Sequence, residues 1–202
     1  MPDNATDPAR AVEMRHETID AAGTPAGALD ALAGQAQPAL LESSALDPRY
    51  GRYSVLACRP REILTVRDGR VLDGAGHRLG GETVLDALRV GLNRFRSTGE
   101  LPTPYGPGWI GYVGYEFGRH IERLPGRAVR DTSLPDLHLA FYDAAAVYDA
   151  IEKRWTLSWL DCPAAAEARD ALHEVGGRRF LLAPECSIDP QTPEANLRAM
   201  LE

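Results

Sequence analysis

One stretch of the sequence gathers polar side chains in a way that could bind a small molecule. Residues 40–54 read LLESSALDPRYGRYS. A carboxylate and two hydroxyls follow a short apolar run, a proline-bounded loop comes next, and the chain returns through an aromatic–Gly–Arg–aromatic sequence. Polar groups that converge at the rim of an apolar sheet form a common kind of small-molecule pocket. A plain strand–loop–strand connection explains the same residues, and from the residues alone we favour it.

A second stretch, residues 104–125, combines glycines with aromatic residues and reads PYGPGWIGYVGYEFGRHIERLP. Its segment Gly106–Gly111 spells GxGxxG, which binds dinucleotides where a strand precedes it and a helix opens on it. Here LPTPY precedes the motif and a strand pattern follows it. We therefore favour close backbone packing over a nucleotide site. The pattern predicts a crowded central strand that turns into a short helix near residues 114–119.

The other ionisable residues identify no catalytic group. The five histidines are scattered, and the sequence contains no P-loop, HExxH or GxSxG motif. Glu116 and Glu122 stand at helical spacing to pair with Arg119 and Arg123, which is a structural role. The three cysteines lie far apart with no CxxC, so we expect neither a zinc site nor a disulfide framework. We predict no catalytic residue and no metal ligand in this chain.

The elements that must position these stretches are mainly strands. Thr24 and Thr83 are typical helix N-caps, and Asp68-Gly69 between two short apolar runs predicts a two-residue hairpin turn. A long run, Leu137–Asp149, is apolar on both faces for much of its length and predicts one central strand. The further strands are expected at residues 11–19, 38–43, 53–58, 63–67 and 155–160, and the helices at 24–33, 83–95 and 163–175.

Composition sets the outer limits on function. The chain has 202 residues, 44% of them hydrophobic and 25% charged, which is typical of a globular protein with a real core. Its net charge of −7 disfavours nucleic-acid binding. The polar opening lacks the apolar core of a signal peptide, and no run approaches the roughly 20 apolar residues that cross a bilayer. We expect a cytoplasmic protein that binds no membrane.

Taken together, three segments resemble the N-terminal half of component I of the chorismate-utilising enzymes, anthranilate synthase and aminodeoxychorismate synthase. They are LLESSALDPRYGRYSVLACRP, GPGWIGYVGYEFGRHIERLP and LPDLHLAFYDAAAVYD, in this order. The match covers about residues 40–160. The form GYEFGRHIERLP looks closer to the aminodeoxychorismate side. The resemblance implies an α+β fold, mainly an antiparallel, sandwich-like sheet with peripheral helices.

In this family the N-terminal half carries an L-tryptophan pocket, completed in part by the C-terminal half. The residues that match its motifs here are Ser43, Tyr50, Gly51, Arg52 and Tyr53. By this resemblance an indole would lie in an apolar crevice, with the amino-acid head near Ser43. We expect residues 1–10 to be a flexible terminus, 11–176 the family-type domain, and 177–202 a linker and the start of a truncated C-terminal region.

The resemblance implies a role in amination of chorismate for p-aminobenzoate and folate synthesis, or, alternatively, for tryptophan synthesis. The family's chorismate and Mg²⁺ sites lie in a C-terminal half with no counterpart in this sequence. We expect the chain to need that half as a partner, together with a glutamine amidotransferase, and to bind no cofactor itself. A stand-alone, non-catalytic amino-acid-binding regulatory module is an alternative of another class, and a non-functional remnant is a third.

Overall fold

The computed structural model describes residues 11–19, 23–43, 45–123 and 132–177. The expected flexible terminus (1–10) and nearly all of the expected linker and truncated region (177–202) lie outside these residues. Ten strands form two sheets within the described ranges, and short helices cover them. The expected α+β class with mainly antiparallel strands is confirmed. None of the helices in these ranges is both long and apolar enough to cross a membrane.

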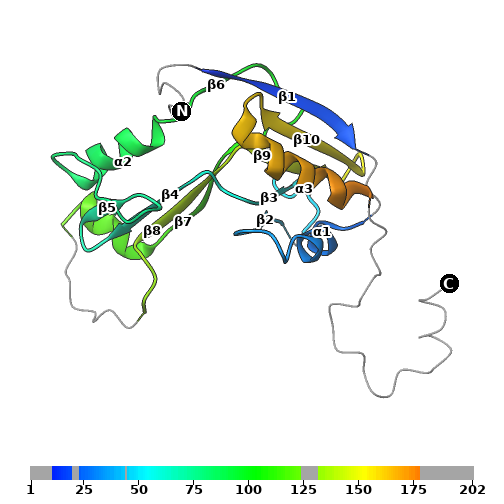
Figure 1. The fold of residues 1–202 in the computed structure, drawn as a ribbon. Coiled ribbons are helices and arrows are strands. Elements are labelled where there is room, and N and C mark those ends of the chain that lie inside the picture. The colour runs from blue at the N-terminus through cyan, green and yellow to red at the C-terminus, as the bar shows by residue number, and fades with distance from the viewer. Residues whose placement is uncertain (1–10, 20–22, 44, 124–131, 178–202) are drawn as a thin grey trace.

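The larger sheet has six strands, and two helices cover one of its faces (Figure 1). Every pair is antiparallel except β1 with β6. In spatial order the strands are β2 (Ala39–Leu41), β3 (Tyr53–Ala57), β9 (Ala144–Asp149), β10 (Arg154–Leu160), β1 (Val12–Ile19) and β6 (Ser97–Thr98). The helices are α1 (Pro25–Ala31) and α3 (Ala166–Gly177), with the single turn η2 (Pro163–Ala165) before α3.

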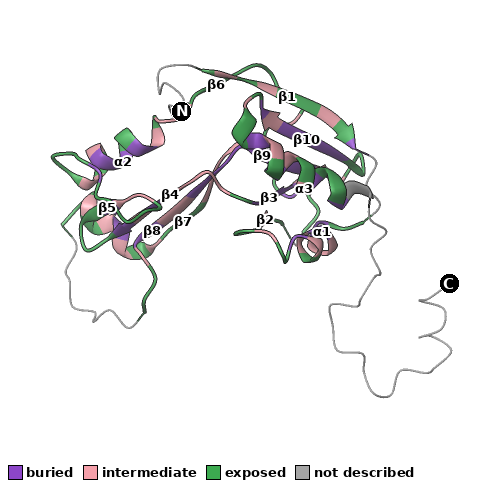
Figure 2. Ribbon diagram, in the orientation of Figure 1, coloured by how far each residue is buried: buried purple, intermediate pink, exposed green. Residues whose placement is uncertain are grey.

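The core of this part lies between the sheet and the two helices. Trp155 and Leu157 of β10 pack against the inward residues of α3, which include Leu172. These side chains are at most 2% exposed. Figure 2 shows the same burial along β9 and β10. The side of α3 that carries Ala168, Leu172 and Val175 faces the sheet, as the apolar spacing predicts.

The smaller sheet has four antiparallel strands and its own core. In spatial order they are β5 (Arg70–Leu72), β4 (Glu62–Arg67), β8 (Leu137–Tyr142) and β7 (Gly108–Val113). Helix α2 (Val84–Leu92) packs its apolar face on β4 and β5, and the 3₁₀ turn η1 (Tyr115–His120) adds Phe117 to this core. The hydroxyl of Thr83 accepts from the Asp86 amide at 3.1 Å, which confirms the expected N-cap.

The prediction of a single strand over Leu137–Asp149 is wrong in one respect. The structure divides it at Asp143 into β8 of the smaller sheet and β9 of the larger one. The chain also passes between the sheets from β3 to β4, through residues 58–61. Both passages lie at the junction where the ribbons of the two sheets meet in Figure 1. The uninterrupted apolar pattern concealed this change of sheet because both strands are buried.

The glycine-rich strand is also placed differently from the prediction. β7 pairs only with β8 among the described residues, so it is an edge strand of the smaller sheet rather than a central one. The expected crowding is nevertheless present, since a Cβ on Gly111 would stand 1.9 Å from the carbonyl oxygen of His138. The expected short helix follows as η1. Glycine at position 111 permits close backbone approach within the sheet.

Candidate functional site

The loop between β2 and β3 is organised by Asp47, a residue that the sequence did not single out. Its carboxylate accepts hydrogen bonds from the amides of Arg49 and Tyr50, both at 2.8 Å. The carbonyl of Asp47 accepts from the Gly51 amide at 2.9 Å. Such a local carboxylate–amide turn is typical of aspartate before a tight reversal. A short loop thus brings the chain back into β3 with a fixed geometry.

Gly51 is required by space rather than by backbone angles. A Cβ at this position would lie 1.9 Å from the carbonyl oxygen of Ala45, and real Cβ atoms essentially never come within 3.0 Å of another atom. The residue is buried beneath the loop. The loop can therefore close over the start of β3 only if this position lacks a side chain.

Arg52 is held at the end of the larger sheet by Asp149, 97 positions later. Its Nε donates to both carboxylate oxygens at 3.0 Å, and its Nη2 donates to Oδ2 at 2.6 Å. The end of β9 is fixed as well, because Asp149 Oδ1 accepts hydrogen bonds from the amides of Ile151 and Glu152. The hydrogen bond from Arg52 lowers the pKa of the Asp149 carboxyl, although partial burial opposes this shift. The same contact raises the pKa of Arg52.

The two stretches singled out in the sequence meet at Tyr53. The ring of Tyr105, from the glycine-rich stretch, stands edge-on to that of Tyr53 with their centroids 6.0 Å apart. The Arg52 guanidinium lies 5.0 Å from the centroid of the Tyr53 ring. Tyr53 and Ile110 both pack against the buried cluster of Val55, Ala145 and Val147. Aromatic rings, an apolar floor and a fixed cation are the components of a pocket for an aromatic or amino-acid ligand.

The five residues suggested by the resemblance are thus divided between two environments. Gly51, Arg52 and Tyr53 lie together at the base of the loop. Ser43 and Tyr50 are on the exposed part of the loop, where Ser43 Oγ donates to the Ala45 carbonyl at 3.3 Å and the Tyr50 ring packs under Arg49. Asp47, Tyr105 and Asp149 complete the arrangement. All three lie in stretches that the sequence marked, but none of them was named as a candidate residue.

No three histidine, cysteine, aspartate or glutamate side chains gather into a possible metal site within the described residues. The Arg52 guanidinium is instead paired with the Asp149 carboxylate. Such an arrangement can bind and orient a ligand.

We predict that the Arg52–Asp149 pair makes folding sensitive to acid. Because the pKa of Asp149 is lower in the folded state, its stabilising contribution is present above its unfolded pKa of about 3.9. The contribution is lost as the pH falls through the folded value. Asp149→Asn should therefore flatten the acid limb of a plot of unfolding free energy against pH, measured by urea denaturation.

Asp161→Asn is the matched control for this prediction. Asp161 also pairs with an arginine, Arg15, but its side chain is 55% exposed, against 8% for Asp149. Exposed ion pairs contribute little to stability. If both variants leave the acid limb unchanged, Asp149 does not hold the strand end through its charge.

Several known proteins are similar to this chain in sequence. No protein-family model matches the chain. Anthranilate synthase component 1 of Arthrobacter globiformis is 33% identical over 150 residues, which cover 71% of this chain and 28% of that protein. Aminodeoxychorismate synthase component 1 of Escherichia coli (strain K12) is 31% identical over 125 residues, covering 60% of this chain and 27% of that protein.

A solved structure shows the same fold. Anthranilate synthase component I from Streptococcus pneumoniae TIGR4 superposes with a TM-score of 0.50 at 22% identity, covering 71% of this chain and 34% of that one. The chain spans about a quarter of the length of the curated relatives it matches. The stronger sequence matches are anthranilate synthases, with aminodeoxychorismate synthases matching slightly less well. This slightly favours the anthranilate side over the aminodeoxychorismate side that residues 114–125 suggested. The chain is therefore homologous to the N-terminal region of component I of the anthranilate and aminodeoxychorismate synthases.

Proposed function

We propose that this chain provides the effector-binding N-terminal region of a component I synthase that aminates chorismate. Its homology to the N-terminal region of such enzymes supports this role. The observation that carries the proposal is the meeting of Tyr53 and Tyr105 beside the fixed guanidinium of Arg52. The region's own residues bind a ligand, and the chemistry of amination takes place on other residues of the complete enzyme.

The reaction proposed for the complete enzyme is the one that both branches share. Ammonia would come from a glutamine amidotransferase subunit, and Mg²⁺ would assist with chorismate. The described residues hold no cluster suited to Mg²⁺, so we assign the metal no ligand among them. The product is anthranilate in one branch and aminodeoxychorismate in the other. We give the anthranilate branch a slight preference, because the anthranilate synthases match this sequence slightly better.

The ligand we propose for the place beside Tyr53, Tyr105 and Arg52 is L-tryptophan. Burial of an indole of about 150–250 Å² gives roughly 4–6 kcal/mol. Association costs at least about 4 kcal/mol. The difference is at most about 2 kcal/mol, so binding to the 202-residue chain should be weak, with a Kd of about 30 mM or above. Gly51, Arg52 and Tyr53 should line the ligand, while Ser43 should meet its amino-acid head.

Titration of the ¹⁵N-labelled chain with L-tryptophan, followed by NMR, tests this proposal. We expect saturable shifts of the Gly51, Arg52 and Tyr53 amides, and weaker binding by Ser43→Ala. Ser97→Ala is the control, because Ser97 is equally exposed but lies on β6 at the far edge of the sheet. The same preparation should form neither product from chorismate, ammonium and Mg²⁺. Turnover by the chain alone, or the absence of saturable shifts, would overturn the proposal.

A further inference from the structure

A cavity of about 360 Å³ lies at the junction of the two sheets, and neither Tyr53 nor Tyr105 lines it. It is open to solvent on one side and is bordered by the link between β3 and β4, by Asp143 between β8 and β9, and by the start of α3. Its volume falls within the range of about 300–1,000 Å³ of small-molecule sites. Its lining residues are Ala36, Arg59, Pro60, Arg61, Asp143, Ala164, Glu167 and Ala168.

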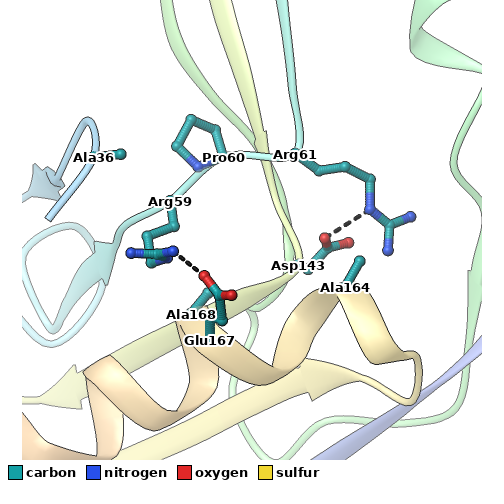
Figure 3. A pocket seen from close by; sticks show the side chains of 8 residues that line it. All are labelled: Ala36, Arg59, Pro60, Arg61, Asp143, Ala164, Glu167 and Ala168. Carbon is teal, nitrogen blue, oxygen red and sulfur yellow. Dashed lines mark hydrogen bonds and ion pairs between the residues drawn. The ribbon is translucent and has the colours of Figure 1, made fainter.

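Two arginine–carboxylate pairs flank this cavity (Figure 3). Arg59 reaches Glu167 of α3, and Arg61 reaches Asp143. The cavity is separate from the loop of Ser43 and Tyr50, because Asp143 precedes the six-residue strand β9 and Asp149 is its last residue. At about 3.3 Å per residue these two residues lie roughly 20 Å apart. Ligands at the two places would therefore contact different side chains.

Asp143 differs sharply from its counterpart Asp149. Its side chain is only 2% exposed, yet Oδ1 has no hydrogen-bond partner within the described residues. Oδ2 forms an ion pair with Arg61 Nε at 2.8 Å. Asp149, in contrast, accepts well-formed bonds on both oxygens. Buried carboxylate oxygens are almost always paired, so Asp143 lacks a donor that something else supplies.

Arg61 is also incompletely satisfied. Its Nη2 donates to Cys162 Sγ at 2.8 Å, and sulfur is a weak acceptor. Its guanidinium carbon stands 5.3 Å from the centroid of the Phe95 ring, and a phenyl ring carries no nitrogen or oxygen acceptor. Arg59 differs, because it bonds the oxygens of both Gln35 and Glu167. The unmet demand in the cavity is therefore a donor for Asp143 and a stronger acceptor for Arg61.

The charges around the cavity limit what can meet that demand. Two guanidinium groups and two carboxylates surround it, so a simple cation would face the arginines and a simple anion would face the acids. A dipolar molecule avoids both costs. The walls contributed by Ala36, Pro60, Ala164 and Ala168 leave room for a short apolar group.

We propose that this cavity binds a small zwitterionic α-amino acid. Its ammonium group donates to Asp143 Oδ1, and its carboxylate accepts from the guanidinium of Arg61. The apolar side chain rests against Pro60 and Ala164. A ligand of this class satisfies both incompletely bonded residues at once. The bound amino acid would contact both passages of the chain from one sheet to the other.

NMR titration of the full chain with three molecules of similar size tests this proposal. They are L-alanine, propionate, which lacks the ammonium group, and ethylamine, which lacks the carboxylate. We expect saturable shifts at Arg61, Asp143 and Ala164 with L-alanine, and at least tenfold weaker binding of the other two. Equal binding of propionate or ethylamine would overturn the zwitterion assignment. The absence of saturable shifts with L-alanine would overturn the site.

Two variants connect the binding to these residues. Asp143→Asn keeps the shape of the side chain but replaces one acceptor oxygen with a donor, so it should weaken L-alanine binding at least tenfold. Arg61→Lys retains the charge and folding interactions of a cation while removing the guanidinium fork, and it provides the test if Asp143→Asn does not fold. Asp161→Asn, on the exposed surface, should bind like the parent chain. Unchanged affinity in a folded Asp143 or Arg61 variant would refute the proposal.

Discussion

Gly111→Ala should lower the free energy of unfolding by about 3 kcal/mol, the upper end of the usual cost of overpacking. The added methyl would stand 1.9 Å from the His138 carbonyl oxygen and 2.9 Å from the Leu139 Cα. These are backbone atoms of the neighbouring strand, so no side-chain rotation can relieve the contact. β7 must move away from β8, and Trp109 and Ile110 then lose part of their packing. Urea denaturation measures the effect.

Gly80→Ala provides the matched control for this prediction. A Cβ on Gly80 would have no atom within 4 Å, so this substitution should change stability by no more than about 0.5 kcal/mol. The comparison tests whether close packing of β7 on β8 explains the glycine at position 111. If Gly111→Ala proves as harmless as Gly80→Ala, close packing of β7 on β8 is not the reason for glycine at this position.

Elements specified by neighbouring residues could be predicted from the sequence. The caps at Thr24 and Thr83 depend on amides three residues later, and the structure contains both bonds. The hairpin at Asp68-Gly69 depends on two residues that tolerate positive φ, and both adopt it, at 49° and 70°. The resemblance to a family added the α+β arrangement, which local patterns do not specify.

Features that depend on distant residues could not be predicted in this way. The partner of Arg52 lies 97 positions away, and nothing near Asp149 marks it as that partner. The apolar run Leu137–Asp149 has the same pattern whether it forms one strand or two, so the change of sheet at Asp143 was hidden. The edge position of β7 likewise depends on sheet order rather than on its own residues. For the same reason the cavity at the junction carried no signal in the sequence.

The Arg61–Asp143 pair should show strong coupling in a double-mutant cycle. Removing one partner of a buried ion pair typically costs about 3–5 kcal/mol, because the other charge is left without compensation. We expect this loss for Arg61→Met, since the side chain of Asp143 is only 2% exposed. Methionine keeps a sulfur–aromatic contact with Phe95 in place of the guanidinium. Urea denaturation of the parent, both single variants and the double variant measures the coupling.

The pH dependence of Arg61→Met gives a second readout. Burial raises the pKa of the Asp143 carboxyl, and Arg61 opposes that shift. Without Arg61 the folded pKa should rise further above its unfolded value. The stability deficit should therefore be smallest below the unfolded pKa and grow as the pH rises through the folded pKa. A deficit that does not depend on pH would mean that lost packing, not an uncompensated charge, causes it.

The double variant Arg61→Met/Asp143→Leu decides why the pair exists. Replacing a buried ion pair with apolar residues of similar volume is often neutral or stabilising. We therefore expect the double variant to unfold with a free energy within about 1 kcal/mol of the parent, well above either single variant. It should at the same time lose L-alanine binding. A protein that keeps its fold without the pair but loses its ligand would show that the pair serves binding. If the two single losses instead add in the double variant, the pair is a structural link between the sheets, and the zwitterion site loses its physical basis.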